Sequence, residues 1–352
     1  PQFQSTMDHS SKVLEATAAN LAHCAELLRG DEVVGMPTET VYGLAGNALN
    51  EVSVRKIFAV KGRPLLDPLI VHFSDLAAAE AHIETNDSVR QLAAAFWPGP
   101  LTMIVPKQAS IPDLVTAGLP SVAIRVPQHP VFRTILERLD FPLAAPSANP
   151  FGYVSPTRAS HVAHTLGSRI QAVLDGGACD FGLESTIVDL RNPQVPVILR
   201  HGPITQAQIN QILQVEVTAH SGASNDTAPQ SAPGLLTKHY SPRARVTLLA
   251  HGETLTADAA LDPGIAVVCN QQPTWHTDQP NIFWLSETGE LNEIAHNLFE
   301  LIQRLDQQDY QQLCIEQAAE EGLGQAINDR LRRAAGPRKI SSVNSSNQAE
   351  SA

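Results

Sequence analysis

Polar side chains that could bind a small anionic substrate occur in four segments of this chain. Residues 37–44 read P-T-E-T-V-Y-G-L directly after a short apolar run, so Thr38 and Thr40 would lie where a buried strand ends. In an α/β fold, ligands bind in the crevice at the carboxyl ends of the strands. The same hydroxyls are also typical of turns and helix caps, so this segment alone leaves both interpretations open.

Two cations separated by one glycine form the second segment. Lys61 and Arg63 flank Gly62, and an apolar run that ends at His72 follows. In an extended turn both cations can point the same way, and the planar fork of an arginine suits the oxygens of a triphosphate. A solvated helix end would carry the same charges, and a histidine that ends an apolar strand is often only structural.

An arginine lies midway along the third segment, residues 121–126. Strict alternation puts three aliphatic side chains on one face, and Ser121, Ala123 and Arg125 on the other. An arginine flanked by small residues indicates the floor of a cavity, where it could hold a substrate carboxylate with two hydrogen bonds. A solvent-facing arginine fits the same pattern.

Small residues with hydroxyl and amide groups form the fourth segment. Residues 144–149 read A-A-P-S-A-N and supply Ser147 and Asn149, and Ser155 follows shortly afterwards. Residues 182–189 are a similar junction between a polar loop and a strand. Because small residues let a ligand approach the backbone closely, both stretches are candidates for binding, although each is also an ordinary loop.

Several familiar motifs are missing. No lysine follows a glycine, so there is no P-loop, and neither G-x-G-x-x-G nor G-x-S-x-G occurs. His161 and His164 share a predicted helix face, but no third ligand lies nearby, so we expect no metal site. The four cysteines are far apart in the sequence, which is typical of reduced core residues.

Charge and hydropathy narrow the class of protein. The net charge of −12 argues against a protein whose main task is to bind a nucleic-acid backbone. A basic cluster from Arg330 to Lys339 is expected at a solvated helix end. No apolar run approaches the roughly 18 residues that cross a bilayer, and the first ten residues lack the pattern of a secretory signal. We therefore expect a cytoplasmic protein that makes no membrane contact.

The elements that would position these residues alternate between helix and strand. The sequence predicts helices over 11–28, after Asn50 as far as Gly62, from Pro130, over 157–167 and over 205–213. It predicts strands over 32–36, 68–72, 101–105, 121–126, 141–145, 186–190 and 197–199. This pattern indicates an α/β domain built on a mixed, twisted sheet.

A second domain is expected after a linker. Residues 218–234 contain no Leu, Ile, Val, Phe or Met, so they are predicted not to pack. Strand patterns over 246–249, 265–269 and 282–285 precede helical patterns between 290 and 335, which indicates a smaller α/β domain. The predicted division is 1–15 as a tail and helix start, 16–213 as the catalytic domain, 214–244 as a linker or lid, 245–340 as the small domain and 341–352 as a disordered tail.

Taken together, these segments resemble the YrdC-like family in its long, two-domain form, the threonylcarbamoyl-AMP synthases. The resemblance rests on P-T-E-T-V-Y-G-L (37–44), K-G-R-P (61–64), P-L-I-V-H (68–72), S-V-A-I-R-V-P (121–127), P-S-A-N (146–149) and E-S-T-I-V-D (184–189). It continues through P-G-L-L-T-K-H-Y-S-P (233–242) and residues 322–335. It implies a YrdC-like twisted mixed sheet with flanking helices and a smaller, Rossmann-like C-terminal α/β domain.

The resemblance also implies an activity and a set of site residues. ATP, L-threonine and bicarbonate would yield threonylcarbamoyl-AMP and pyrophosphate, so the enzyme would be a nucleotidyltransferase acting before threonylcarbamoyladenosine formation in tRNA. By the same resemblance Lys61 and Arg63 would be catalytic. L-threonine would be held by Thr38, Thr40, His72, Arg125 and Ser185; ATP by Lys61, Arg63, Ser121, Ser147, Asn149, Ser155 and Arg200; and His239 and Tyr240 would belong to a lid.

Cofactor and partners follow from the same resemblance. Mg²⁺ would accompany ATP, and the product would pass to a downstream tRNA threonylcarbamoyl-transferase complex, with a weak contact to double-stranded RNA or tRNA left open. Asp67 departs from the pattern, which often has asparagine before Pro-Leu, and its charge would weaken ATP binding. Two alternatives are a hydrogenase-maturation carbamoyltransferase, whose zinc-finger cysteine pairs are missing here, and a non-catalytic RNA-binding module on the same fold.

Overall fold

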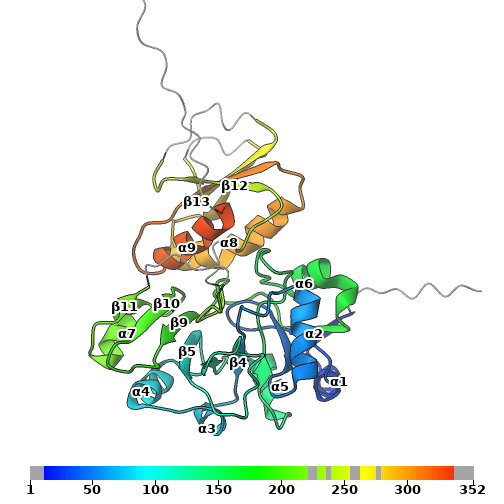
Figure 1. The fold of residues 1–352 in the computed structure, drawn as a ribbon. Helices are drawn as coiled ribbons and strands as arrows, with labels where there is room; N and C mark the ends of the chain where they lie inside the picture. Colours follow the sequence, from blue (N-terminus) through cyan, green and yellow to red (C-terminus); the bar gives the residue numbers. More distant parts are fainter. Residues whose placement is uncertain (1–11, 221–227, 235–238, 254–261, 275–278, 337–352) are drawn as a thin grey trace, which may run out of the picture.

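The computed structural model describes residues 12–220, 228–234, 239–253, 262–274 and 279–336. Within these ranges the chain forms a large body built on a mixed sheet and a small body built on a parallel sheet (Figure 1). Both bodies combine sheet and helix, so the predicted α/β class is confirmed. No helix among the described residues has the length and apolar character needed to span a bilayer.

The large sheet has the strand order β1-β8-β2-β3-β7-β4-β6-β5-β9-β10-β11. Its strands are β1 (Lys12–Glu15), β2 (Val34–Met36), β3 (Gly43–Asn47), β4 (Ile70–His72), β5 (Leu101–Pro106), β6 (Ser121–Arg125), β7 (Leu143–Ala144), β8 (Ala172–Asp175), β9 (Thr186–Asp189), β10 (Val197–Arg200) and β11 (Thr218–Ala219). Its helices are α1 (Ala18–Arg29), α2 (Glu51–Lys61), α3 (Leu76–Glu80), α4 (Asp87–Phe96), α5 (Pro130–Glu137), α6 (Ala159–Leu166) and α7 (Gln206–Leu213), with a 3₁₀ turn at Gly167–Arg169.

Local sequence explains most helix boundaries. Asn50 caps α2 by accepting a hydrogen bond from the Val52 amide, and Gly62 ends the helix in the left-handed conformation with φ 63°. Pro130 is the first residue of α5, as predicted. The helix predicted over 11–28 was wrong at its start, because residues 12–15 form β1 and pair in parallel with β8. Thr17 caps α1 instead, by accepting from the Asn20 amide.

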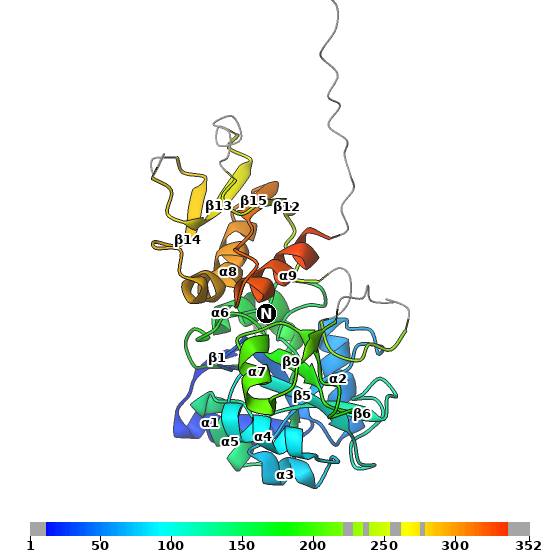
Figure 2. The same cartoon turned by 90° about the vertical axis from the view of Figure 1, so that its left-hand side faces the viewer.

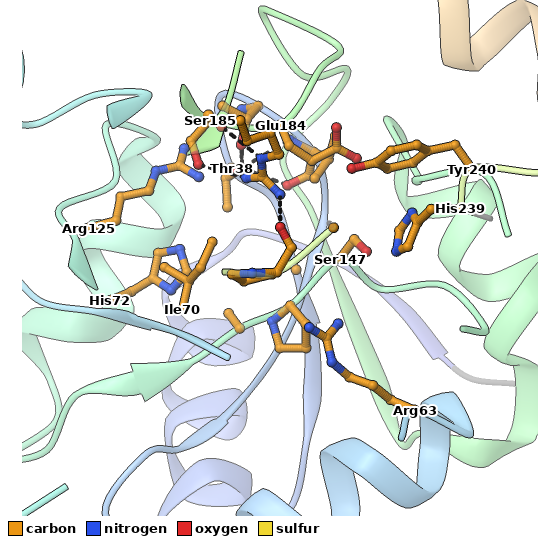
Figure 3. A pocket seen from close by; sticks show the side chains of 18 residues that line it. Thr38, Arg63, Ile70, His72, Arg125, Ser147, Glu184, Ser185, His239 and Tyr240 are labelled. Carbon is orange, nitrogen blue, oxygen red and sulfur yellow. Dashed lines mark hydrogen bonds between the residues drawn. The ribbon is translucent and has the colours of Figure 1, made fainter. Parts of the chain in front are cut away.

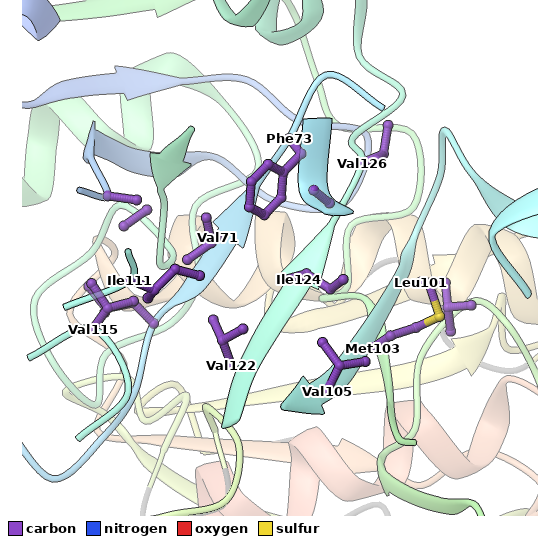
Figure 4. Packing of buried hydrophobic residues seen from close by; sticks show 14 of the residues in the cluster. Val71, Phe73, Leu101, Met103, Val105, Ile111, Val115, Val122, Ile124 and Val126 are labelled. Atoms are coloured by element: carbon purple, nitrogen blue, oxygen red, sulfur yellow. The ribbon is translucent and has the colours of Figure 1, made fainter. Parts of the chain in front are cut away.

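The main core lies on one face of the central strands. Val71 of β4, Met103 and Val105 of β5, and Val122 and Ile124 of β6 project into one buried cluster (Figure 4). Because side chains alternate along a strand, the neighbours of these residues project from the opposite face. Ile70, His72 and Arg125 therefore share that second face, on which the candidate site lies.

The small sheet has the order β12-β15-β13-β14, and all of its paired strands are parallel. Its elements are β12 (Arg245–Leu249), β13 (Ile265–Gln271), β14 (Ile282–Ser286), α8 (Leu291–Asp306), β15 (Gln312–Glu316) and α9 (Gly324–Ala335). The sequence predicted three of these strands and missed β15, whose five residues Q-L-C-I-E give too short an alternation to recognise.

Helices α8 and α9 lie between the small sheet and the large body in both views (Figures 1 and 2). Their apolar residues form a cluster that also takes in Val41, Val154 and Leu183 of the large body. The Tyr153 hydroxyl donates to Asp306 at 2.7 Å, and Arg158 pairs with Glu300 at 2.9 Å. The two bodies are therefore joined by a packed interface with polar contacts at its margin.

The predicted linker packs more closely than its composition suggested. Ala232, Pro233 and Gly234 are buried, and Ala232 packs with Ile70 and Ala123 on the second face of the sheet. The prediction that residues 218–234 do not pack was therefore wrong for this end, because the small Ala232 side chain packs against apolar residues of the strands. The predicted tail at 341–352 and residues 1–11 lie outside the described residues.

Candidate functional site

A cavity with about 50 Å³ of free volume lies on the second face of the large sheet. Ile70, His72 and Arg125 form its floor, a term used here for these three side chains. Pro233, Gly234, His239 and Tyr240 form its roof, a term used here for these four residues. The remaining lining comes from loops and strand ends: Thr38, Thr40, Val41, Gly43, Arg63, Ala145, Pro146, Ser147, Glu184, Ser185 and Arg200.

Strand register brings the floor residues together. His72 and Arg125 are register partners in the parallel pair β4 and β6. Strand β5 is antiparallel to β6 and parallel to β9, so the start of β9 lies at the same edge of the sheet as the end of β6. Ser185 immediately precedes β9 and therefore lies at the same edge as Arg125. Residues far apart in the sequence thus meet at one cavity because the sheet is mixed.

Arg125 is buried, so the alternative that this arginine faces solvent was wrong. Its Nη2 donates to Glu39 Oε1 at 2.6 Å, and its Nε donates to the Gly99 carbonyl at 3.2 Å. Glu39 also accepts the Gln128 amide at 3.1 Å, so the carboxylate is itself held in place. The Arg125 guanidinium is therefore fixed in orientation at the cavity floor (Figure 3).

His72 is held neutral beside Arg125. Burial, reinforced by the positive charge of Arg125, lowers the pKa of His72 to about 3. Its Nδ1 is buried without a hydrogen-bond partner among the described residues, and its ring lies 5.2 Å from the Phe132 ring. A buried nitrogen with no partner in a cavity wall is a group that a polar ligand can satisfy.

The two threonines serve both interpretations that the sequence left open. Thr38 Oγ1 accepts the amides of Thr40 and Val41, which is a turn motif, and its hydroxyl lies 2.9 Å from Thr40 Oγ1. Both residues are buried and both border the cavity. The turn therefore presents hydroxyl groups to the cavity.

Lys61 and Arg63 do not form an extended turn with parallel side chains, so that expectation was wrong. Lys61 is the last residue of α2, and its Nζ donates to the carbonyls of Ser147 and Asn149 at 2.5 and 2.6 Å. Burial, followed by the charge of Arg63, lowers the pKa of Lys61 well below its ordinary value. Because of the left-handed Gly62, Arg63 points elsewhere and reaches the cavity, which Lys61 does not border.

Arg63 forms an ion pair with Asp67, the residue at which the sequence departs from the family pattern. Its Nη2 lies 3.0 Å from Asp67 Oδ2, and its Nε and Nη2 donate to the carbonyls of Asp67 and Pro68. Both side chains are buried. Burial raises the pKa of Asp67, and the nearby charge of Arg63 opposes that shift. The charge that Arg63 could offer a ligand is thus partly neutralised within the protein.

Arg200 connects the sheet to the roof. It donates to the Ser185 carbonyl at 3.0 Å and to Ser185 Oγ at 3.1 Å, and its Nη1 lies 3.4 Å from the Pro233 carbonyl. Ser185 Oγ is also 2.7 Å from Thr102 Oγ1. Arg200 therefore fixes a residue of the cavity edge and a residue of the roof at once.

The roof is irregular backbone that aromatic contacts hold in place. Tyr240 is buried with φ 62°, and its ring stacks on Phe299 of α8 at 5.6 Å. Its ring centroid is 4.1 Å from that of His239. Burial raises the pKa of Tyr240 to about 12 and, together with nearby cations, lowers the pKa of His239 well below its ordinary value. Both side chains lie across the cavity from the floor (Figure 3).

Four expected site residues do not border the cavity in this structure: Lys61, described above, and Ser121, Asn149 and Ser155. Asn149 Nδ2 donates to the carbonyls of Pro150 and Tyr153, and the Ser155 hydroxyl donates to Glu184. Ser121 is buried on β6 without reaching the cavity. Of the residues expected at the site, ten border the cavity: Thr38, Thr40, Arg63, His72, Arg125, Ser147, Ser185, Arg200, His239 and Tyr240.

Sequence reasoning missed the acidic and basic partners of the site. Glu39 and Glu184 stand inside the quoted motifs, but nothing local shows that each would meet an arginine from a distant segment. Arg330 was expected at a solvated helix end, and this was wrong, because its side chain is fully buried against Glu184. No group of three metal-binding side chains occurs among the described residues, so the cavity walls offer no carboxylate cage for a resident ion.

Comparison with known proteins shows the family to which the chain belongs. Residues 26–202 match the Sua5/YciO/YrdC family model, described as telomere recombination, and residues 204–336 match the C-terminal domain of threonylcarbamoyl-AMP synthase. The fold is also similar to that of Escherichia coli YciO, with TM-score 0.50 at 18% identity over 56% of this chain and 99% of that one. The chain therefore belongs to the Sua5/YciO/YrdC family.

Some relatives match the chain over most of its length. It is 38% identical to the threonylcarbamoyl-AMP synthase of Pyrococcus abyssi, over 90% of this chain and 94% of that one. It is 35% identical to the Bacillus subtilis enzyme, over 93% and 96% of the two chains. It superposes on P. abyssi Sua5 complexed with L-threonine with TM-score 0.82, 33% identity, and coverage of 92% and 98%. Within the family, the chain has the two-domain architecture of these synthases.

Proposed function

We propose that the cavity makes threonylcarbamoyl-AMP from L-threonine, bicarbonate or CO₂, and ATP, with release of pyrophosphate. One observation carries this proposal: Arg63 and Arg125, each paired with a buried carboxylate, border the same cavity. Two separated cationic groups suit a substrate pair with two separated anionic ends. The enzyme would be a cytoplasmic nucleotidyltransferase whose product serves threonylcarbamoyladenosine formation in tRNA next to the anticodon.

The amino-acid end of the cavity is assigned to the floor and its neighbours. Arg125 would hold the carboxylate of L-threonine, since its guanidinium is already oriented by Glu39 and Gly99. Thr38, Thr40, His72 and Ser185 would surround the remaining polar groups. The P. abyssi relative has been solved with L-threonine, which supports threonine as the amino acid.

The nucleotide end is assigned to Arg63, Ser147 and Arg200, which border the cavity. Lys61 would reach phosphate oxygens by exchanging its carbonyl partners at Ser147 and Asn149 for them. Ser121, Asn149 and Ser155 would shape the wall behind this end. Mg²⁺ would enter with the triphosphate as part of the substrate and keep most of its water ligands, because the described walls supply no carboxylate cluster.

The chemistry requires no protein nucleophile. The threonine amine adds to CO₂ and loses a proton, which gives a carbamate. A carbamate oxygen then attacks the α-phosphorus, and the bond to the β-phosphate oxygen breaks, so that pyrophosphate leaves with the electron pair. Catalysis rests on positioning and on cations that stabilise charge at the phosphates. Arg63 and Arg200, which border the nucleotide end of the cavity, would supply that charge.

A roof over the cavity fits the lability of the intermediates. A free volume of about 50 Å³ holds only a few water molecules, so the roof must move before a nucleotide and an amino acid can bind. Once it closes again, it would exclude water from the carbamate and from the mixed anhydride. His239 and Tyr240 would then act as the lid.

The test is product analysis by mass spectrometry with ATP, L-threonine and bicarbonate. We expect threonylcarbamoyl-AMP, and pyrophosphate release that requires both threonine and bicarbonate. The alternative, a non-catalytic RNA-binding module, predicts no pyrophosphate and tight binding of RNA. The buried position of Arg63, Arg125 and Arg200 disfavours that alternative, because a nucleic-acid backbone needs accessible cations. Transfer of the product to a tRNA-modifying complex would be tested separately, by adding that complex and tRNA.

A further inference from the structure

One arginine of the small body contacts a residue that lines the cavity. Arg330 lies on α9 and its side chain is fully buried. Its Nε donates to Glu184 Oε2 at 2.9 Å, and its Nη2 lies 3.4 Å from the Glu184 carbonyl. The other carboxylate oxygen of Glu184 accepts the Ser155 hydroxyl. Both the side chain and the backbone of Glu184 are therefore held from across the interface.

Glu184 stands directly at the cavity. It borders the cavity itself and precedes Ser185, which borders it too (Figure 3). Ser185 in turn receives two hydrogen bonds from Arg200. A shift of Glu184 would therefore move the residue that we assign to the amino-acid end of the site.

Arg330 also supports the roof. Its Cζ lies 5.6 Å from the centroid of the Tyr240 ring, a distance typical of a cation–π contact. The same ring stacks on Phe299 of α8. Two helices of the small body thus hold Tyr240 in its left-handed backbone conformation, which costs energy in a residue with a side chain.

A contact that only joins the two bodies would not need a fully buried arginine beside the cavity. Arg158 and Glu300 form such a contact, since they pair at 2.9 Å while both stay partly exposed and neither borders the cavity. Burying a guanidinium completely carries a large desolvation cost, which a hydrophobic pair would avoid. The placement of Arg330 between Glu184 and Tyr240 therefore calls for a role at the cavity itself.

We propose that Arg330 is a positioning residue through which the small body sets the geometry of Glu184, Ser185 and Tyr240 around bound L-threonine. This inference rests on the proposed function, which it deepens by giving the small body a part in amino-acid binding. It assigns Arg330 no contact with substrate, because Arg330 does not border the cavity.

The test compares Arg330→Met with Arg330→Lys in the full-length chain. Steady-state pyrophosphate release gives KM for threonine and for ATP, and calorimetry gives threonine binding without turnover. We expect Arg330→Met to raise the threonine KM by about tenfold or more, because breaking a buried ion pair leaves Glu184 uncompensated, while the ATP KM changes by less than about threefold. Arg330→Lys should restore part of the threonine affinity, since it keeps the charge but loses the fork.

A structural role alone gives a different result. Loss of folded protein lowers the active fraction and leaves KM unchanged, so a lower thermal midpoint with an unaltered threonine KM would overturn the proposal. Arg158→Met is the matched control, because it removes an interface arginine remote from the cavity; we expect it to leave both KM values unchanged. An equal rise of the threonine KM in Arg158→Met would also count against a specific role for Arg330.

A second variant keeps the proposal testable if Arg330→Met does not fold. In Arg330→Met combined with Glu184→Gln, neither side of the pair carries a charge, so stability should recover relative to Arg330→Met. We expect its threonine KM to remain higher than that of Glu184→Gln alone, and equality of the two would refute the positioning role. If the wild-type protein binds threonine but releases no pyrophosphate, the proposed reaction fails while calorimetry still tests Arg330. If it binds no threonine, both proposals fail.

Discussion

The floor and the roof of the cavity are built in opposite ways. The floor residues stand on paired strands, where the register of β4 with β6 fixes His72 beside Arg125. The roof is irregular backbone with positive φ at Gly234 and Tyr240, and side chains such as Arg200, Phe299 and Arg330 hold it. A sheet opens only at a cost near that of global unfolding, whereas a loop held by side chains can open locally. The floor is therefore suited to orient substrates and the roof to admit them.

The largest effect is expected at Arg63, which borders the cavity but belongs to neither the floor nor the roof. Arg63→Met should lower kcat/KM by about 100-fold or more, because it removes positive charge from the phosphates at which adenylyl transfer takes place. Pyrophosphate release at varied ATP gives the value. Arg55→Met is the control on the preceding helix, where Arg55 forms an exposed pair with Glu51. Activity of Arg63→Met close to wild type would exclude Arg63 from phosphate binding.

The floor itself is tested next. Arg125→Met should weaken threonine binding by roughly 1.5–3 kcal/mol, the range for a hydrogen bond to a charged group. Calorimetric titration with threonine measures the change, and ATP binding should be little affected. The substitution leaves Glu39 buried without its partner, so Arg125→Met combined with Glu39→Gln separates binding from stability. An unaltered threonine affinity in both variants would remove Arg125 from the amino-acid end.

Gly182 lies at the contact between the two bodies, and its substitution tests how firmly α8, which packs on the roof, is held. Gly182 has φ 71°, and a Cβ there would lie 2.5 Å from the His296 carbonyl oxygen of α8. Gly177 has φ 85° with open space around it. Gly177→Ala should cost only the strain of a left-handed residue, about 1 kcal/mol, whereas Gly182→Ala should cost more because backbone must also move. Urea unfolding compares them, and equal losses would show that the interface tolerates a shift of α8.

The smallest effect is expected at the pair that restrains Arg63. Asp67→Asn removes the negative charge 3.0 Å from the guanidinium and keeps the shape of the side chain. The ATP KM should fall about two- to fivefold, because Arg63 would no longer exchange one anion for another on binding. Initial rates at limiting ATP measure this change. A higher KM would mean that Asp67 positions Arg63 rather than competing for it.

Much of the floor was predictable from the sequence. Alternation along 121–126 placed Arg125 opposite the core-facing valines, and the structure confirms that face. Thr38, Thr40, His72 and Ser185 were also expected near strand ends, and all border the cavity. The faces of His72 and Arg125 were predictable because a period of two along a strand is a local property, which each short segment carries by itself.

The partners of the charged groups were not predictable. Lys61 and Arg63 looked equivalent in K-G-R-P, yet the helix end at Lys61 and the left-handed Gly62 send them to different partners. Glu39 and Arg125 are 86 residues apart, and Glu184 and Arg330 are 146 residues apart. No local pattern encodes such a pair, because either side chain would suit solvent equally well.

By itself the sequence determined the elements, the apolar faces and the residue types offered to a ligand. Only the tertiary structure decided which cations meet at one cavity, which of them are neutralised, and that Arg330 of α9 pairs with Glu184, which borders the cavity. The physical reason is that secondary structure follows from neighbours in the chain, whereas the energy of a buried charge depends on whatever partner the fold brings to it.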